Sequence, residues 1–219
     1  MTAQPPAPGQ PELGEDSQLA RLVRIMHQLR SGCPWDAEQT HRSLATYLVE
    51  ETGEVLDAIE AGDDTDLREE LGDLLLQVVF HSEIAAGEGR FTIEDVAAGI
   101  SDKLVRRHPY VFDQGSQPPD DIDASWEARK RAEKGRTSAL EGIAEHLSVL
   151  ARATKVTSRS RNHHVGVAMD DEPIGADEVG QQILSLVQRA QASGVDADQA
   201  TRDALRAFER RVIEAEATG

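Results

Sequence analysis

The sequence predicts an all-α fold, an antiparallel bundle of helices. Apolar residues recur at helical spacing along most of the 219-residue chain. Short turns rich in Gly and Asp separate these stretches, and no convincing alternation of apolar and polar residues indicates a strand. Because short connections join neighbouring helices antiparallel, we expect the helices to pack as a bundle.

Caps and turn residues place the first three helices. Ser17 can cap a helix that ends near Gly32. After a loop, a second helix is expected over 44–61. The turn at 62–65 ends it and begins a third helix, which runs to about residue 86.

The later part of the chain alternates helices with polar connections. Thr92 and Asp95 resemble a capping box, which begins a helix that Pro109 ends. Residues 114–123 are predicted to form a polar linker, and a charged helix through 126–130 follows it.

The length allows one domain with a good core and a smaller appendage. We expect a disordered tail over residues 1–16, which are rich in Pro, Gln and Gly. The main domain is predicted to cover 17–135, and a smaller helical region is predicted to cover 136–219.

Two groups of acidic residues lie inside the most apolar helices. One group comprises Glu50, Glu51 and Glu54, and the other comprises Glu70 and Asp73. In each group a spacing of three residues places side chains on one helix face beside an apolar stripe. Two helices packed by these stripes hold the carboxylates together in a partly dry groove. Because the carboxylates repel one another there, this arrangement is unstable unless they are protonated or bind a cation.

Oxygen ligands alone favour a hard cation, Mg²⁺ or Mn²⁺, over zinc. The candidate metal ligands are Glu51, Glu54, Glu70 and Asp73. A di-iron carboxylate protein is disfavoured because Asp73 stands where a Glu-x-x-His pair needs histidine. A second alternative is an acidic helix face that is only solvated. A third is a non-catalytic helical interaction or regulatory module that uses the acidic groove to bind a basic partner.

A basic cluster supplies the complementary charge. Lys103 and Arg107 share one helix face at a spacing of four residues, and Arg106 lies next to them. Arginine grips phosphate oxygens in a fork and lysine adds a compact charge, so the cluster suits a triphosphate. The alternative is a set of solvated cations near a helix C-terminus. Trp126 is a candidate for contacting a nucleotide base.

Five motifs in the same order resemble those of the MazG-type nucleoside triphosphate pyrophosphohydrolases, of the all-α NTP pyrophosphatase group. They are Gly32-Cys33-Pro34-Trp35-Asp36-x-Glu38-Gln39-Thr40-His41, Glu50-Glu51-x-x-Glu54, Glu70-Leu71-Gly72-Asp73-Leu74-Leu75, Ser101-Asp102-Lys103-Leu104-x-Arg106-Arg107-His108-Pro109 and Trp126-Glu127-x-x-Lys130. The resemblance covers about residues 19–130. It implies Mg²⁺-dependent hydrolysis of ribo- and deoxynucleoside triphosphates to the monophosphate and pyrophosphate, with Mn²⁺ as a substitute cation, by a homodimer or higher homo-oligomer.

The resemblance also implies roles for individual residues. Glu51, Glu54, Glu70 and Asp73 are expected to hold the metal, and Glu50 is either a further ligand or the group that accepts the proton of the attacking water. The residues expected to bind substrate are Lys103, Arg106, Arg107, Trp126 and Lys130.

The C-terminal region resembles a degenerate, shortened second copy of the family domain. Helices are expected over 139–153 and 204–215, with a loop over 157–171. Ala207 stands where the first copy has Lys103, and no second pair of acidic motifs is present.

Composition agrees with a cytoplasmic enzyme. The net charge of −17, from 23 Lys and Arg against 40 Asp and Glu, argues against nucleic acid as a partner. The single cysteine, Cys33, cannot form an internal disulfide. No stretch resembles a signal peptide or a membrane span, so no membrane partner is expected.

Overall fold

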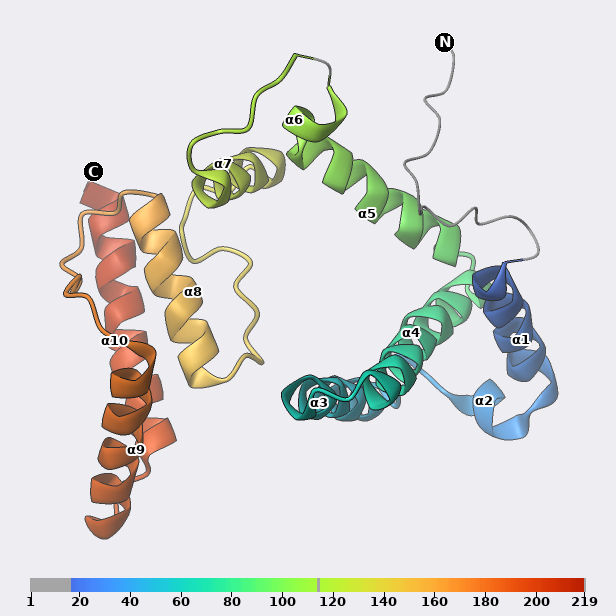
Figure 1. Ribbon diagram of the computed structural model, residues 1–219, viewed down its shortest axis with the longest axis horizontal. Helices are drawn as coiled ribbons and strands as arrows, with labels where there is room; N and C mark the ends of the chain where they lie inside the picture. Colours follow the sequence, from blue (N-terminus) through green and yellow to red (C-terminus); the bar gives the residue numbers. More distant parts are fainter. Residues whose placement is uncertain (1–16, 114, 219) are drawn as a thin grey trace. The chain divides into compact units, whose positions relative to one another are not determined.

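The computed structural model of the chain describes residues 17–113 and 115–218, apart from the side chains of residues 123 and 124. All regular elements of these residues are helices, which confirms the predicted all-α fold (Figure 1). The predicted tail over residues 1–16 lies outside the described residues, as does Gln114 at the start of the predicted linker.

Ten helices follow one another along the described residues. In chain order they are α1 (Gln18–Gly32), α2 (Pro34–Glu38), α3 (Ala45–Ala61), α4 (Asp64–Gly87), α5 (Ile93–Arg107), α6 (Pro109–Phe112), α7 (Ile122–Lys134), α8 (Val149–Asn162), α9 (Ala176–Ala192) and α10 (Ala197–Thr218). None of them combines the length and the apolar composition that a bilayer span requires.

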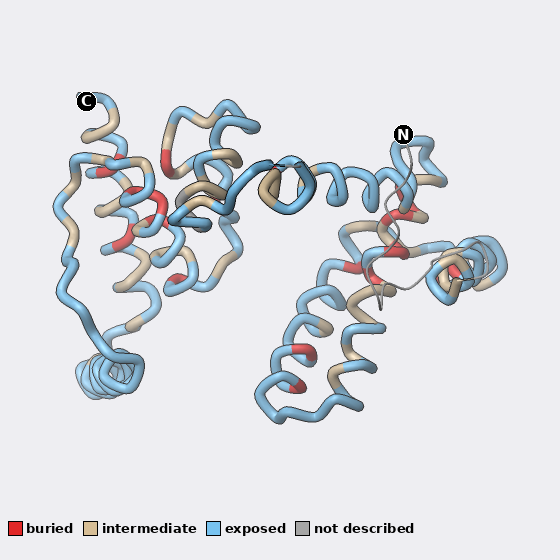
Figure 2. Tube along the Cα trace, turned by 45° about the horizontal axis from the view of Figure 1, so that its top comes forward, coloured by how far each residue is buried: buried red, intermediate tan, exposed pale blue. Residues whose placement is uncertain are grey.

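Packing divides the chain into two compact units. The first ends at Arg106 and the second begins at Arg107. Buried residues form one set in each unit (Figure 2). Helix α7 belongs to the second unit, where it packs on α8. The predicted division near residue 135 follows the motifs instead, and it stays a prediction.

The core of the first unit lies between α1 and the C-terminal half of α4. Its buried members are Met26, Leu44, Val79, Phe80 and Ile84. The predicted helices over 44–61 and from 62–65 to about 86 are confirmed as α3 and α4.

The connection between α3 and α4 is short and well capped. Gly62 ends α3 in a left-handed conformation, with φ of 71°, which glycine adopts without steric cost. The side chain of Asp63 then accepts hydrogen bonds from the backbone N–H groups of Thr65 and Asp66. The two helices therefore run antiparallel and pack along their length.

The apolar stripes of α3 and α4 are buried only in part. Val79 is buried, but Leu48 is 37% exposed, Ile59 is 56% exposed and Leu71 is 48% exposed. Helix α1 packs beside the core residues of α4, whereas α3 packs mainly on α4 and meets α2 through the rings of Tyr47 and Trp35. The rest of the hairpin thus keeps an open apolar surface.

Two shorter features of the first unit bear on the sequence predictions, one as a correction and one as a confirmation. Helix α2 occupies part of the predicted loop, and Pro34 stands at its first position, which suits proline. The capping box of α5 is confirmed, because the carboxylate of Asp95 accepts hydrogen bonds from the backbone N–H and the hydroxyl of Thr92.

The second unit is built on α7, α8 and α10, with α9 packed on α10. Its buried cluster comprises Ile143, Val149, Val156 and Leu205. The predicted helix over 204–215 is confirmed within the longer α10.

The predicted boundaries around α8 are wrong. Residues 139–148 form turns rather than a helix, because Ser148 caps α8 by accepting a hydrogen bond from the N–H of Ala151. The predicted loop over 157–171 begins only at His163. The reason is tertiary: Ser160 in the last turn is fully buried, although its polar neighbours resemble a loop.

Candidate functional site

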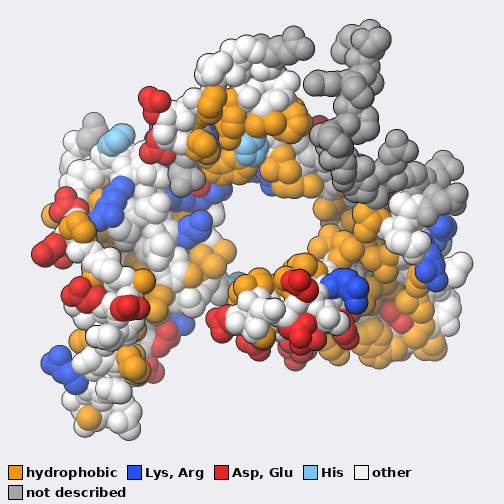
Figure 3. All heavy atoms as spheres, viewed as in Figure 1, with side chains coloured by type: hydrophobic (Ala, Val, Ile, Leu, Met, Phe, Trp, Pro, Cys, Tyr) orange, Lys and Arg blue, Asp and Glu red, His pale blue; other side chains and the backbone are white. Residues whose placement is uncertain are grey.

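The α3–α4 hairpin brings three of the four predicted metal ligands together. One side-chain oxygen each from Glu51, Glu70 and Asp73 lies within 4.8 Å of the others. Glu51 stands on α3, whereas the other two stand on successive turns of α4. Acidic side chains gather over this hairpin (Figure 3). The predicted convergence of these carboxylates is confirmed, while their role as ligands remains a prediction.

The electrostatics of the cluster show that its negative charges oppose one another. The pKa of Glu51 is raised, first by partial removal from water and then by the charges of Asp73, Glu54 and Glu70. The pKa of Glu70 is raised by the same causes, with Glu54 and Asp73 the main charges. A bound cation would remove this repulsion.

Glu54 and Glu50 differ in their relation to the cluster. Glu54 stands one turn from Glu51 on α3, and its charge acts on both Glu51 and Glu70. It therefore borders the group of three. Glu50 is exposed and lies outside that group.

The motif segment Gly32–His41 is fixed within the first unit by side chains of α1 and α4. Arg30 donates hydrogen bonds to two of its backbone oxygens. Nδ1 of His41 lies 2.7 Å from Nδ1 of His81 on α4, and the two rings stack 5.0 Å apart. Partial burial and the neighbouring His41 lower the pKa of His81. The stacked pair of histidines therefore anchors the end of the segment.

The predicted basic cluster is divided between the two units. Lys103 is half-buried and Arg106 is exposed, and both belong to the first unit. Arg107 belongs to the second unit, where it is 5% exposed. Its Nη2 lies 2.5 Å from an oxygen of Glu133, and its guanidinium stands 4.8 Å from the ring centre of Trp126. Arg107 is thus already paired within its own unit.

The last motif, on α7, forms part of the same polar network. Nζ of Lys130 lies 3.0 Å from a carboxylate oxygen of Glu127. Partial burial acts to raise the pKa of Glu127. The hydrogen bond and charge of Lys130, together with Arg159 and Lys155, outweigh burial and lower the pKa below its ordinary value. Glu127 is therefore a charged partner of several cations.

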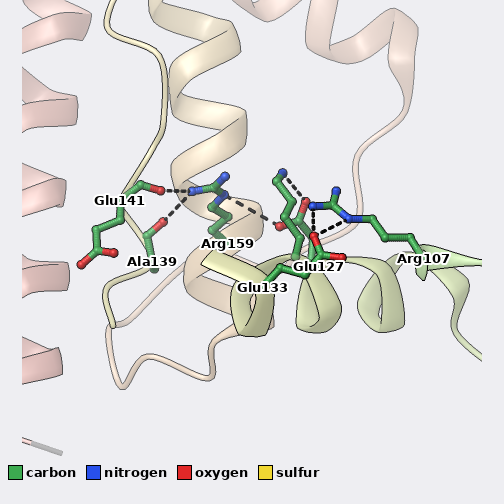
Figure 4. Close-up of polar contacts among 7 residues, drawn as sticks. Arg107, Glu127, Glu133, Ala139, Glu141 and Arg159 are labelled. Carbon is green, nitrogen blue, oxygen red and sulfur yellow. Dashed lines mark hydrogen bonds and ion pairs between the residues drawn. The ribbon is translucent and has the colours of Figure 1, made fainter. Parts of the chain in front are cut away.

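The sequence analysis missed Arg159 of α8, which joins this network from the second half of the chain. Its guanidinium lies 3.9 Å from Glu127 and donates hydrogen bonds to the backbone oxygens of Ala139 and Glu141 (Figure 4). The residue is only 6% exposed. No motif marked it, and its one signal in the sequence is its position three residues after the apolar Val156, which places both side chains on one face of α8.

Comparison with known proteins identifies the family of this site. Residues 39–112 match the model of the MazG nucleotide pyrophosphohydrolase domain. The nucleoside triphosphate pyrophosphohydrolase of Escherichia coli K12 is 40% identical over an alignment of 230 residues, gaps included, which covers 91% of this chain and 88% of that protein. The chain belongs to the MazG family. This membership confirms the resemblance that the five motifs indicated.

Two further relatives cover most of the chain. The nucleoside triphosphate pyrophosphohydrolase/pyrophosphatase MazG of Thermotoga maritima is 38% identical over 214 residues, covering 87% of this chain and 82% of that protein. An uncharacterized 26.1 kDa protein of Streptomyces cacaoi is 44% identical over 204 residues, covering 91% of this chain and 83% of that protein.

The MazG family model spans both acidic groups and the cluster from Lys103 to Arg107, but it ends before Trp126. The donor set fits a divalent cation, because three carboxylates from two helices converge, and burial together with neighbouring negative charge raises the pKa values of Glu51 and Glu70. The acidic cluster therefore lies within the part of the chain that the family model matches.

Proposed function

We propose that this MazG-family enzyme hydrolyses ribo- and deoxynucleoside triphosphates to the nucleoside monophosphate and pyrophosphate. The observation that carries the proposal is the group formed by Glu51, Glu70 and Asp73, whose oxygens lie within 4.8 Å of one another. The relatives from E. coli and T. maritima, which are named for the hydrolysis of nucleoside triphosphates, support the substrate class. A nucleotide substrate also fits the expected cytoplasmic location.

Glu51, Glu54, Glu70 and Asp73 are the proposed ligands of the metal. Their oxygen-only chemistry favours Mg²⁺, with Mn²⁺ as a substitute. When bound, a divalent cation neutralises phosphate charge and lowers the pKa of water. The carboxylates supply the negative charge that holds it, and the two helix backbones fix their spacing before substrate arrives.

Glu50 has two proposed roles. It stands beside Glu51 on α3 and is exposed. A carboxylate at this position can accept the proton of the attacking water as a general base, or it can be a further ligand. The metal affinity of a Glu50 variant distinguishes the two roles, because loss of a ligand weakens that affinity whereas loss of a base leaves it unchanged.

The proposed substrate contacts are those that the family resemblance implied. Lys103 and Arg106 stand on α5, where their positive charges suit phosphate oxygens. Arg107, Trp126 and Lys130 are proposed to act together on substrate, with Trp126 positioned by the guanidinium of Arg107. A cation held against the ring fixes the ring plane, which a base-stacking role requires.

We further propose that the enzyme is a homodimer or higher homo-oligomer through the α3–α4 hairpin. Leu48, Leu56, Ile59 and Leu71 are exposed on these two helices. An open apolar surface of this kind is typical of a protein interface. Light scattering coupled to size-exclusion chromatography tests this: a monomer at micromolar concentration contradicts it.

The proposed activity is tested with a panel of ribo-, deoxy- and damaged nucleoside triphosphates. Pyrophosphate and phosphate are detected separately, with Mg²⁺, with Mn²⁺ and with chelator. We expect pyrophosphate and the monophosphate only in the presence of cation. A non-catalytic interaction module shows no turnover with any substrate, and a di-metal redox protein purifies with iron and visible absorbance.

A further inference from the structure

A hollow of about 330 Å³ lies within the second unit, apart from the acidic cluster in sequence and in charge. Its walls come from the end of α7, the segment that follows α7, the residues after α8 and the last turn of α10. The charged and titratable residues that line it are Arg131, Arg136, His163, His164 and Glu216. We name it the basic hollow. Its volume equals that of roughly ten water molecules, which is enough for a small polyanion.

The two arginines of the basic hollow differ from the arginines of this unit that form ion pairs. Arg107 and Arg152 each pair with a carboxylate. Among the residues that the structure describes, the guanidinium groups of Arg131 and Arg136 have no hydrogen-bond or ion-pair partner. Their charges are therefore available to a ligand.

The backbone near Arg136 makes room for its guanidinium. A Cβ built on Gly142 would stand 2.5 Å from Nη2 of Arg136, and Gly142 has a left-handed φ of 68°. A residue with a side chain would therefore displace the arginine. Glycine at this position lets the half-buried guanidinium stay inside the unit rather than extend into water.

Positive charge in and around the basic hollow is not locally balanced. Partial burial lowers the pKa of His163, the charges of Arg131 and Arg159 lower it further, and Glu216 and Glu127 oppose them. Burial, followed by the charge of Arg136, also lowers the pKa of Arg159. Glu216 is the only acid in the lining, and its carboxylate already accepts a hydrogen bond from the N–H of Ala139. Repulsion among these cations stabilises any state in which an anion sits between them.

We propose that the basic hollow binds a small phosphorylated anion through the guanidinium groups of Arg131 and Arg136. Guanidinium forks pair with phosphate oxygens through two parallel hydrogen bonds, and two forks suit two linked phosphate groups. Free pyrophosphate and the polyphosphate tail of a nucleotide share this chemistry. The lining holds no aromatic ring other than the two imidazoles, so the base of a nucleotide adds no stacking contact.

The first test is isothermal titration calorimetry of the full-length protein with inorganic pyrophosphate at pH 7 in the presence of EDTA. Chelation leaves the acidic cluster without a cation, and its carboxylates then repel the anion. We expect Arg131→Gln and Arg136→Gln each to weaken binding about tenfold, or ~1.4 kcal/mol, and the double variant to abolish it. Arg210→Gln, an exposed arginine of α10 outside the lining, is the matched control and should bind as the wild type does.

Two further arms test whether the basic hollow recognises linked phosphates, in free pyrophosphate and in a nucleotide tail alike. Without metal, ATP should bind with an affinity close to that of pyrophosphate, whereas AMP, with a single phosphate, should bind at least about tenfold more weakly. Equal affinity for AMP and pyrophosphate contradicts recognition of linked phosphates.

The second readout does not depend on variants that could misfold. Pyrophosphate in the basic hollow adds negative charge beside His163, which faces Arg131, Arg159, Glu127 and Glu216. In an NMR titration the pKa of His163 should rise by about 1 or more when pyrophosphate is added. The exposed His146 is outside the lining and should not respond. An unchanged His163, or a double variant that binds like the wild type, overturns the proposal.

Discussion

Arg159 of α8 and Glu127 of α7 form an ion pair with 3.9 Å between Nε and the carboxylate oxygen. The pair joins the last family motif to a helix of the C-terminal region. Both hydrogen bonds from Arg159 to backbone oxygens go to the segment between these helices, at Ala139 and Glu141. One buried side chain therefore holds α7, α8 and their connection together.

The first prediction is that Arg159→Met destabilises the second unit. The substitution keeps an unbranched apolar stem but removes the ion pair and both backbone hydrogen bonds, leaving buried acceptors without donors. We expect the free energy of unfolding to fall by about 2–4 kcal/mol. Urea unfolding followed by tryptophan fluorescence measures it. In a Trp35→Phe background the signal reports on Trp126, which lies in the second unit.

The matched control for this prediction is Arg202→Met. Arg202 pairs with Asp198 one turn away on α10, and both side chains are largely exposed. Such a pair contributes about 0–1 kcal/mol, so the control should unfold close to the wild type. Equal stability of the two variants contradicts the role given to Arg159.

The acidic cluster could be predicted from the sequence because its geometry is mostly local. The spacing of Glu70 and Asp73 fixes them on one face of α4 whatever else the chain does. The short turn at Gly62 then pairs α3 with α4 and brings Glu51 near them. Only one tertiary contact had to be inferred, and the apolar stripes indicated it.

The network around Arg159 could not be predicted in this way. Arg159 and Glu127 lie 32 residues apart, and their meeting depends on how α7 packs on α8. The same holds for Arg107, which the motif marks as a cation for substrate but which packing buries against Glu133. Spacing along one helix gives no sign of a carboxylate that arrives from another.

The second prediction concerns the proposed ligands. Glu51→Gln and Asp73→Asn each remove a charge but keep the shape of the side chain, so the helical circular dichroism spectrum should not change. We expect hydrolysis of nucleoside triphosphates to fall by about 100-fold or more, since even residues that only support a ligand contribute about 10–100-fold. Near-normal Mg²⁺-dependent turnover in both variants contradicts the assignment.

Glu60→Gln is the control for these substitutions. Glu60 is an exposed residue of the same helix, and it lies outside the group that could hold a cation. Its loss changes the net charge of the protein by the same amount as Glu51→Gln. Activity should therefore stay within about twofold of the wild type if the position of the charge, rather than the total charge, matters.

The third prediction concerns pH and metal removal. The pKa values of Glu51 and Glu70 are raised above 4.5, so the folded metal-free protein holds these two protons more tightly than the unfolded chain does. The protonated carboxyls therefore stabilise the folded state fully below pH 4.5, and this contribution to the free energy of unfolding is lost as the pH rises through the raised pKa. At pH 7 in EDTA, Glu51→Gln should therefore have a Tm about 2–4 °C above that of the wild type.

Two comparisons complete this test, both by thermal unfolding. At pH 4.5 the Tm difference between Glu51→Gln and the wild type should shrink, because a larger fraction of the wild-type carboxyl is then protonated than at pH 7. At pH 7 with Mg²⁺ the wild type should gain more stability than the variant, since the cation binds only the charged carboxylates. A wild type that is more stable than the variant in EDTA at pH 7 refutes the repulsion that motivates the metal site.

The last prediction concerns a chain that ends at Gly135. All five family motifs precede this point, and the motifs alone predict that activity is kept. Packing predicts otherwise, because α7 packs on α8 and Glu127 loses Arg159 when the remainder is removed.

The core around Met26 and Phe80 stays intact in the shortened chain. Hydrogen exchange should accordingly show protected amides over 79–84 and unprotected amides over 125–134. We expect kcat/KM to fall by on the order of 10-fold, since Trp126 and Lys130 lose their fixed positions. Full activity together with protected α7 amides would mean that α7 holds its conformation without the C-terminal helices.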